Sequence, residues 1–390
     1  MPGSAPTSFV VLLASVLKPV DDTRMREKFA ETLAARPGTV VHVAGRAAGQ
    51  ASKAGHSPTV SLHPIFQGSR LSLARLAAQW RYWQLLRRVK PGLVFVHAPE
   101  LLPLTLLWQL LGQGRRFLYD IRENYALNVS TQGVYQGLMR RLLAGGLRWV
   151  EGLAARRAAA VVLAEESYAD ELPFLRQLPP SRILVLENKY QPAPGEGLPS
   201  QPRLLPPTSE PLRLLFSGTI SVLNGIWEAI ALAEKLHAVW PGGARLTIVG
   251  FCQQPALLLQ LQEKVASHPN LLRLVGGAQP VPHSEIVAEI GRSHLGLLPY
   301  RPHPSTARCR PTKLFEYLAH GLPVLYPPNP LWRALAQTHQ AGLETDFQQV
   351  DAAVLSAQLS RASFYPAGIP AEALWATEGE KLQLLLDSLV

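Results

Sequence analysis

The chain has 390 residues, of which 47% are hydrophobic and 17% are charged. This length exceeds what a single hydrophobic core serves, so about two domains are expected, and the apolar content excludes a wholly disordered protein. The only two cysteines, Cys252 and Cys309, exclude a disulfide framework, and no Cys/His cluster has zinc-ligand spacing. The expected compartment is a reducing cytoplasm.

Neither a membrane span nor an export signal is expected. No run reaches the ~18 apolar residues that a membrane-spanning helix needs. Residues 9–17 are apolar enough to resemble a signal-peptide core, but no Lys or Arg precedes them and no small-residue cleavage site follows. We therefore expect a buried first strand at this position.

The net charge of +10 is unevenly distributed. Residues 1–190 hold 24 Lys and Arg against 13 Asp and Glu, whereas residues 191–390 hold 14 against 15. Such an asymmetry between halves indicates that the first half meets something anionic.

Alternating strands and helices are predicted throughout the first half. In chain order they are a strand at 9–17, a helix at 23–35, a strand at 39–43, a helix at 71–89, a strand at 92–97, a helix at 101–111, a strand at 116–120, a helix at 135–159, and strands at 160–164 and 182–186. Short apolar runs separated by helical periods predict a parallel sheet with helices on both faces.

Residues 191–211 hold seven prolines and no hydrophobic period, which predicts a semi-rigid linker. The second half then repeats the first, with strands at 212–217, 244–249, 271–275, 294–299 and 323–326, helices at 226–239, 256–267, 284–292 and 313–319, and a last helix at 372–389. The predicted fold class is α/β, with two doubly wound, Rossmann-like parallel-sheet domains at 1–190 and 212–371.

In open parallel sheets, ligands collect where strands end. In the first half, polar residues follow three predicted strands: Asp22 and Arg24, then His97, then Asp120 and Glu123. Each has a structural alternative: Asp22 or Thr23 can cap the next helix, His97 can hold a structural hydrogen bond, and the carboxylates around Arg122 can form a salt-bridged corner.

In the second half, Gly218 and Thr219 end a strand, and Asn224 lies just before a helix. Small residues there let backbone amides approach a phosphate, although the GxGxxG and GxxxxGK[ST] fingerprints are missing. Further on, Arg308, Arg310 and Lys313 crowd a helix start that Thr312 can cap. Helix dipoles disfavour cations at that end, so a bound diphosphate would explain them, against the alternative of a surface ion pair between Lys313 and Glu316.

The stretch PTKLFEYLAHGLPV at 311–324 resembles the donor-binding motif of GT-B-fold glycosyltransferases, especially the family-4-like retaining enzymes of bacterial surface-polysaccharide assembly. Supporting matches are FSGT at 216–219, LTIVG at 246–250, NLLRLVG at 270–276, LGLLPY at 295–300 and YDIRE at 119–123. The resemblance implies a nucleotide-sugar donor on the second domain, an acceptor on the first, a cleft between them, and a last helix (372–390) that crosses back to the first domain.

The resemblance also implies roles for single residues. Glu316 would bind the ribose hydroxyls, Lys313 and Arg310 would neutralise the diphosphate, and residues 275–278 would frame the base. The implied nucleotide-sugar site comprises Gly218, Thr219, Asn224, Val275, Gly276, Arg308, Arg310, Thr312, Lys313, Leu314 and Glu316. The implied catalytic candidates are His97, Asp120 and Glu123. No cofactor and no metal are expected, because the chain has no Asp-x-Asp pair.

Three positions depart from the family pattern. Cys309 stands where relatives commonly carry a second carboxylate, and Thr219 and Asn224 stand where they commonly carry Arg and Lys. The alternative to an active transferase is therefore a catalytically weak or inactive GT-B-like protein that binds a nucleotide or glycan.

Two predicted helices of the first half combine cations with aromatic residues, which suits an anionic lipid surface. Candidate acceptor or membrane contacts are Asp22, Arg24, Arg81, Arg87, Arg88, Arg140 and Arg141. We therefore expect a cytoplasmic protein that attaches to the inner face of the cell membrane, the alternative being an ordinary solvated basic face. Nucleic acid is not expected as a partner, because no nucleic-acid-binding signature accompanies the charge.

Overall fold

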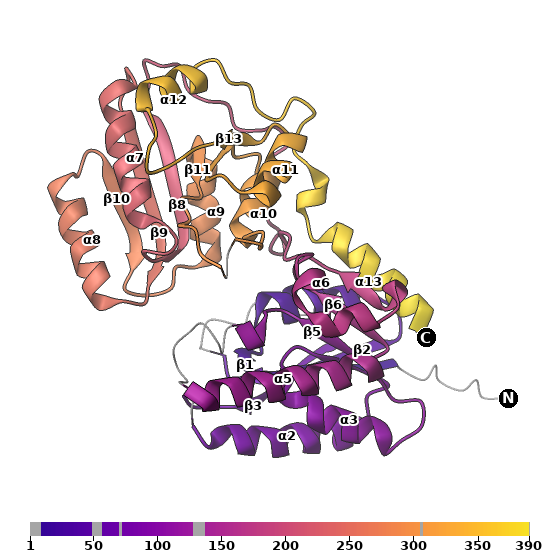
Figure 1. Ribbon diagram of the computed structural model, residues 1–390. Coiled ribbons are helices and arrows are strands. Elements are labelled where there is room, and N and C mark those ends of the chain that lie inside the picture. The colour runs from indigo at the N-terminus through magenta and orange to yellow at the C-terminus, as the bar shows by residue number, and fades with distance from the viewer. Residues whose placement is uncertain (1–8, 49–56, 70–71, 128–136, 305–306, 390) are drawn as a thin grey trace. The chain divides into compact units, whose positions relative to one another are not determined.

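The computed structural model describes residues 9–48, 57–69, 72–127, 137–304 and 307–389 (Figure 1). The chain divides into two compact units. Unit 1 takes the chain up to Pro194 together with the segment from Trp375 onward, and unit 2 is Gly195–Leu374. The proline-rich segment after Gly195 therefore belongs to unit 2, and the C-terminal segment packs with unit 1.

Unit 1 is built on a seven-stranded, fully parallel sheet with the strand order β3-β2-β1-β4-β5-β6-β7. The strands are β1 (Phe9–Pro19), β2 (Thr39–Arg46), β3 (Val60–Phe66), β4 (Leu93–Val96), β5 (Arg116–Ile121), β6 (Ala160–Leu163) and β7 (Ile183–Val185). The central strands are apolar and buried along most of their length, as expected where helices cover both faces.

The helices of unit 1 connect these strands, except the last helix, which follows unit 2 in the chain. They are η1 (Thr23–Ala30) continuing into α1 (Glu31–Ala34), α2 (Ala74–Val89), η2 (Pro99–Leu101), α3 (Leu102–Leu110), α5 (Gly137–Arg157), α6 (Tyr168–Glu171), η3 (Pro173–Gln177), η4 (Pro180–Arg182) and α13 (Ala376–Leu389). Because the sequence order reverses at β1, right-handed crossovers place α2, α3 and α5 on one face of the sheet and α1 on the other. There α1 packs against α13, whose Leu382 and Leu386 enter the core around Phe29.

Unit 2 has a six-stranded, fully parallel sheet with the order β10-β9-β8-β11-β12-β13. Its strands are β8 (Leu212–Ile220), β9 (Ala244–Cys252), β10 (Leu272–Gly277), β11 (Leu295–Leu297), β12 (Val324–Tyr326) and β13 (Gly342–Glu344). Its helices are α7 (Ile226–Val239), α8 (Pro255–Ser267), α9 (His283–Arg292), α10 (Thr312–Ala319), α11 (Pro330–Thr338), α12 (Ala352–Leu359) and η5 (Ala371–Ala373).

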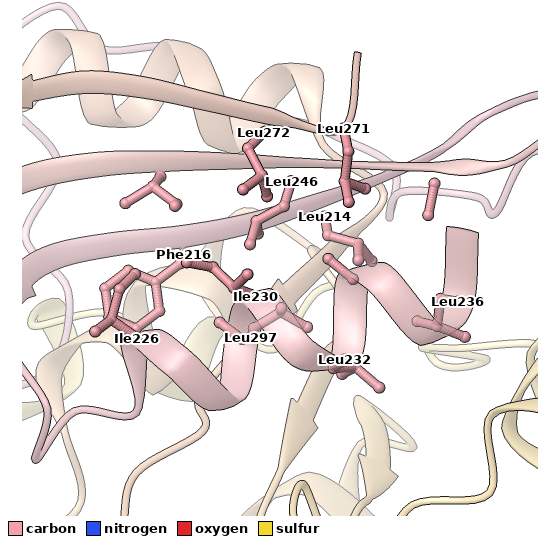
Figure 2. Close-up of a cluster of buried hydrophobic side chains, with 14 of the residues drawn as sticks. Leu214, Phe216, Ile226, Ile230, Leu232, Leu236, Leu246, Leu271, Leu272 and Leu297 are labelled. Atoms are coloured by element: carbon pink, nitrogen blue, oxygen red, sulfur yellow. The ribbon is translucent and has the colours of Figure 1, made fainter. Parts of the chain in front are cut away.

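The core of unit 2 forms where α7 packs on the sheet. Figure 2 shows Ile226, Ile230 and Leu236 of α7 beside Leu214 and Phe216 of β8, all at most 2% exposed. This packing fixes the end of β8, which carries the glycine predicted to approach a phosphate.

The predicted fold class is confirmed, since both units are doubly wound parallel α/β structures. Two edge strands were missed. Strand β3 contains Pro64, which removes one ladder donor and lowers its strand signal, and β13 has only three residues. Both sheets reverse their order at the first strand, so ligand sites are expected beside the ends of β1 and β4 and beside the ends of β8 and β11.

Candidate donor and acceptor sites

In unit 2, Lys313 lies directly over the backbone at the end of β8. Gly218 adopts φ +86°, and a Cβ at this position would lie 2.6 Å from Lys313 Cε. The Lys313 ammonium is 5.0 Å from the ring centre of Phe216 and 5.5 Å from that of Tyr300. Burial lowers the pKa of Lys313 to about 8, although the Glu316 carboxylate opposes this shift. A glycine and a lysine distant in sequence thus form one cationic site.

The N-terminus of α10 lies at this site. Pro311 holds the cap position and no side chain caps the helix, so the prediction that Thr312 caps it is wrong: Thr312 is already the first helical residue. An uncapped helix start presents backbone N–H groups and a positive dipole end, which favour an anion. Leu314 is fully buried, so its side chain packs in the core instead of facing a ligand.

One turn further along α10, the Glu316 carboxylate is nearly buried and bonded to a histidine. Its Oε1 lies 2.6 Å from Nε2 of His283, the first residue of α9, and the His283 side chain is half exposed. A carboxylate held beside a helix start can accept hydrogen bonds from a vicinal diol. Sequence reasoning missed His283, because it has no fixed spacing from the motif at 311–324.

Other predicted donor-site residues surround this centre at the strand ends. Gly276, at the end of β10, has φ +83° and lies against Gly250 O, where a side chain would clash; its neighbour Val275 is half-buried. Asn224 donates from Nδ2 to Thr219 O at 2.8 Å, so its amide closes its own loop. Arg308 is exposed and Arg310 half-buried on the segment before α10, which Trp332 holds through a bond from Nε1 to Cys309 O at 2.7 Å.

In unit 1, the predicted residues form a buried charge network at the ends of β1, β4 and β5. Arg24 donates from Nη2 and Nε to the two carboxylate oxygens of Asp120, at 2.7 and 3.0 Å. Burial opposes ionisation of Asp120, but Arg24 and His97 hold its pKa well below its usual range. Arg24 is 2% exposed, so the structure places it inside this network and away from any surface contact.

His97 completes the network. Its Nδ1 lies 2.7 Å from Asp120 Oδ2, and burial lowers its pKa although Asp120 opposes this shift. A neutral His97 therefore donates from Nδ1 to the carboxylate and leaves Nε2 as an acceptor. This Nε2 is buried and has no hydrogen-bond partner among the described residues. Of His97 and Asp120, His97 is therefore the group that can accept, at Nε2, a proton or a hydrogen bond from a hydroxyl group.

Asp22 and Glu123 lie in two further ion pairs of unit 1. Asp22 accepts two bonds from Arg122, at 2.8 and 3.0 Å, and caps Met25 N at 3.0 Å, which confirms its capping role. Burial by itself would raise the pKa of Asp22, but Arg122 lowers it on balance. Glu123 bonds Lys18 Nζ at 3.0 Å. The predicted salt-bridged corner is therefore only partly present: Arg122 pairs with Asp22, whereas Asp120 pairs with Arg24 and Glu123 with Lys18.

The remaining predicted contacts lie on helices. Arg81, Arg87 and Arg88 are exposed on α2, and Arg141 is exposed on α5. The side chain of Arg140 lies outside the described residues. No group of three or more His, Cys, Asp or Glu that could hold a metal ion occurs in the part of the chain that the structure describes. Within the same part, no helix is long and apolar enough to cross a membrane.

Residues 23–189 match the family model described as a glycosyl transferase 4-like domain. Over 186 residues the chain is 24% identical to glycogen synthase from Mycobacterium tuberculosis, an overlap of 48% of this chain and 42% of that protein. The chain therefore spans less than half the length of the curated relatives it matches.

Solved structures resemble the chain over nearly its whole length. Sucrose-phosphate synthase from Thermosynechococcus elongatus matches with a TM-score of 0.60 at 14% identity, covering 97% of this chain and 98% of that one. HepE from Anabaena, solved in complex with UDP and glucose, matches with a TM-score of 0.58 at 14% identity, covering 98% and 100%. The fold is thus GT-B, with two Rossmann-like domains. Over residues 23–189, the match to a glycosyl transferase 4-like domain agrees with the resemblance to family-4-like glycosyltransferases.

Proposed function

We propose that the protein is a glycosyltransferase, of the hexosyltransferase type, that moves a sugar from a nucleotide-diphosphate donor to a glycan or lipid-linked acceptor. The observation that carries this proposal is the site of unit 2, where Lys313 over Gly218, the uncapped start of α10 and the Glu316 carboxylate lie together. Cation, helix dipole and carboxylate are what a nucleoside diphosphate requires for its phosphates and its ribose.

In this proposal the donor binds without a metal. Lys313, with Arg308 and Arg310 before α10, would neutralise the diphosphate, and Val275 and Gly276 would frame the base. Glu316 would accept bonds from the ribose hydroxyls, which requires it to exchange or share its bond with His283. The carboxylate would then accept two hydrogen bonds from the vicinal ribose hydroxyls in place of the one from His283.

Transfer with retention is proposed on the resemblance; in it the leaving phosphate takes the acceptor proton while the site stabilises the charge developing on the diphosphate. His97, held in one tautomer by Asp120, would then accept a hydrogen bond at Nε2 from a hydroxyl of the transferred sugar. An inverting reaction would instead need a base; Asp120, which is ion-paired and held at a low pKa, is a poor one, so His97 Nε2 or Glu123 would have to take that role. In the retaining reaction, Asp120 would therefore position His97, and Glu123 would lie near the acceptor.

The test is calorimetric titration, without metal, with UDP, GDP, ADP, CDP and dTDP. UDP comes first, because HepE was solved with UDP and glucose. We expect one diphosphate to bind, and Glu316→Ala to weaken it at least tenfold. Glu285→Ala, which removes an exposed carboxylate from α9, is the matched control and should bind like the wild type. Failure of all five diphosphates to bind would overturn the donor site.

The alternative is a GT-B-like protein that binds nucleotide or glycan with little or no transfer. The observation in its favour is Asn224, whose amide is engaged within its own loop where relatives commonly offer a phosphate cation. To distinguish the enzyme from the binding protein, the protein is incubated with sugar nucleotides that carry the same base as the diphosphate that binds. Release of nucleoside diphosphate above the Lys313→Ala background supports the enzyme, and tight binding without any release supports the alternative.

A cytoplasmic location at the inner face of the cell membrane belongs to the same proposal. It is supported by the concentration of positive charge in the first half of the chain, which suits a lipid-linked acceptor on an anionic surface.

A further inference from the structure

Exposed hydrophobic side chains gather on one face of unit 1. Of the fifteen large hydrophobic residues that are exposed in the described part of the chain, nine lie on or at the ends of α2, α3 and α5, with exposed fractions from 40 to 83%. They are Leu73, Leu76, Trp80, Leu107, Leu110, Leu111, Leu142, Leu143 and Trp149. Monomeric proteins rarely expose contiguous apolar patches of this kind, so the face is expected to have a partner.

The spacing shows that each helix turns an apolar stripe outward. Leu73, Leu76 and Trp80 are separated by three and four residues, and Leu142 and Trp149 by seven, which places each set along one side of a helix. The opposite sides face the core: Tyr82 of α2 is fully buried and bonded to Thr105 of α3 at 2.8 Å. Of the aromatic residues on the predicted helix at 71–89, Tyr82 therefore belongs to the interior, whereas Trp80 belongs to the surface.

The three helices form one continuous surface. Helix α3 packs against both α2 and α5, and Figure 1 shows all three together in the lower part of unit 1. We call the exposed side of α2, α3 and α5 the helical face.

The helical face is also positively charged. The stretches 74–90, 102–111 and 137–157 contain ten Lys and Arg and a single acid, Glu151. Glu151 is 1% exposed and accepts a hydrogen bond from Tyr119 Oη at 2.7 Å, so it lies beneath the face and not on it. Among the described residues, the three helices therefore offer solvent arginines, lysine, leucines and tryptophans, but no carboxylate.

A pocket of about 600 Å³ lies between the C-terminal ends of α2 and α3 and carries this charge next to the apolar stripe. Its lining includes three cations, Arg87, Lys90 and Arg115, together with Leu111, and no described residue in the lining is acidic. Arg115 is held in place by a bond to Trp108 O at 2.6 Å. A pocket of cations beside exposed leucines matches a phosphate headgroup whose acyl chains continue into an apolar layer.

We propose that the helical face docks onto a lipid bilayer containing anionic phospholipids, with Leu107, Leu110, Leu142 and Trp149 entering the acyl boundary and the pocket at Arg87 and Lys90 taking a headgroup phosphate. Charge complementarity selects this occupant, because an arginine-rich apolar face meets its opposite charge on an anionic leaflet. Glu100, directly before α3, is paired with Arg75 of α2 at 3.1 Å and leaves the other cations of the face in excess. The exposed leucines and tryptophans add apolar insertion to the electrostatic attraction. Salt screens the attraction between charges but not the insertion of apolar side chains. The proposal extends the membrane location proposed above by naming the surface and its mode of binding.

The test is flotation of the full-length protein with vesicles of phosphatidylcholine alone or with phosphatidylglycerol. We expect binding to the anionic vesicles that weakens, but persists, when the salt is raised. Leu110→Glu with Trp149→Glu should reduce binding at least tenfold, and Arg87→Gln with Lys90→Asn should reduce it several-fold and flatten its salt dependence. The matched control is Leu259→Glu with Leu384→Glu, which alters equally exposed leucines of α8 and α13 and should bind like the wild type.

Vesicle binding is independent of sugar transfer, so its outcome and that of the calorimetry are separable. A wild-type protein that does not float with anionic vesicles, or variants of the helical face that float like the wild type, would overturn the proposal. Gel filtration without lipid tests whether a second copy of the chain binds the helical face instead. If the wild type is a dimer that does not bind vesicles, and Leu110→Glu with Trp149→Glu makes it monomeric, the face is a dimer interface and membrane docking is refuted.

Discussion

At the scale of single residues, burial decides which charged groups can act. Asp120 and Arg24 neutralise each other inside unit 1. The cost of burying two ions is offset by their bidentate geometry and by the further bonds of Arg24 to Leu186 O and of Asp120 to His97. The consequence is a rigid carboxylate that fixes the tautomer of His97. In unit 2, Lys313 has no such partner within ion-pair distance among the described residues, and it rests on the rings of Phe216 and Tyr300. A cation in that position is ready to receive an anion.

This state of Lys313 predicts a pH dependence of nucleotide binding. Burial lowers the pKa of Lys313 to about 8 in the free protein, whereas a bound diphosphate would favour the charged form. Binding above this pKa must therefore take up a proton, and the affinity for the diphosphate should fall as pH rises from about 7.5 to about 9.5, by up to about tenfold per unit above 8.

Titration calorimetry in buffers of different ionisation enthalpy measures this proton uptake directly. Lys313→Arg is the control, because arginine stays charged throughout this range and should flatten the profile. An affinity of the wild type that is independent of pH would show that Lys313 does not face the phosphates.

At the scale of elements, close backbone approach at the strand ends of unit 2 dictates the residue type. Gly250 has φ +154°, and a Cβ there would lie 1.7 Å from Gly218 O. The ends of β8 and β9 can therefore pair only if this position has no side chain. Gly145 of α5 is the opposite case, because no heavy atom lies within 4 Å of the position of its Cβ.

The two glycines predict opposite effects of the same substitution. Gly250→Ala should destabilise the protein by at least about 2 kcal/mol, because it forces β8 and β9 apart and strains a backbone that L-residues rarely adopt. Gly145→Ala should stabilise it by about 0.5–1 kcal/mol, because alanine loses less backbone entropy in a helix. Urea denaturation followed by circular dichroism measures both. A neutral Gly250→Ala would show that the strand ends are looser than described.

At the scale of the whole molecule, the C-terminal segment is part of unit 1. Trp375, Leu382 and Leu386 are at most 2% exposed within its core, and Trp375 packs on Phe29 with ring centres 5.4 Å apart. The fully buried Glu378 carboxylate pairs with Lys189 at 2.6 Å. The core of unit 1 is therefore completed by residues that follow unit 2 in sequence.

Truncation after Leu374 should consequently destabilise unit 1 and spare unit 2. Three large side chains leave the core, at about 2–5 kcal/mol each, and the buried Lys189 loses its partner Glu378. Limited proteolysis with mass spectrometry should then show new cleavage within residues 9–194 and none within 212–359. Leu384→Ala, which shortens a side chain of α13 that is 69% exposed, is the control and should change neither unit. Equal protection of the truncated and full-length proteins would contradict this assignment.

The fold could be predicted because it depends on local periodicity. Apolar runs of strand length between helical periods predict a parallel sheet. The motif at 311–324 combines a helix start, cations and a carboxylate in one short stretch. The positions of Gly218, Lys313 and Glu316 at one strand end follow from those two facts. The edge strands β3 and β13 were not predicted, because their burial depends on neighbouring strands and helices that the local sequence pattern does not contain.

What the sequence determined by itself was the class of fold, the donor motif and the excess of positive charge in the first half, since each depends on residues close together in the chain. Only the tertiary structure decided which charges are usable. It buried Arg24 and Asp120 as a pair, brought His283 onto Glu316 from 33 residues away, and turned Tyr82 inward while leaving Trp80 in solvent. The physical reason is that burial and pairing are properties of three-dimensional neighbours, and these come from separate elements whose contacts no local pattern of residues specifies.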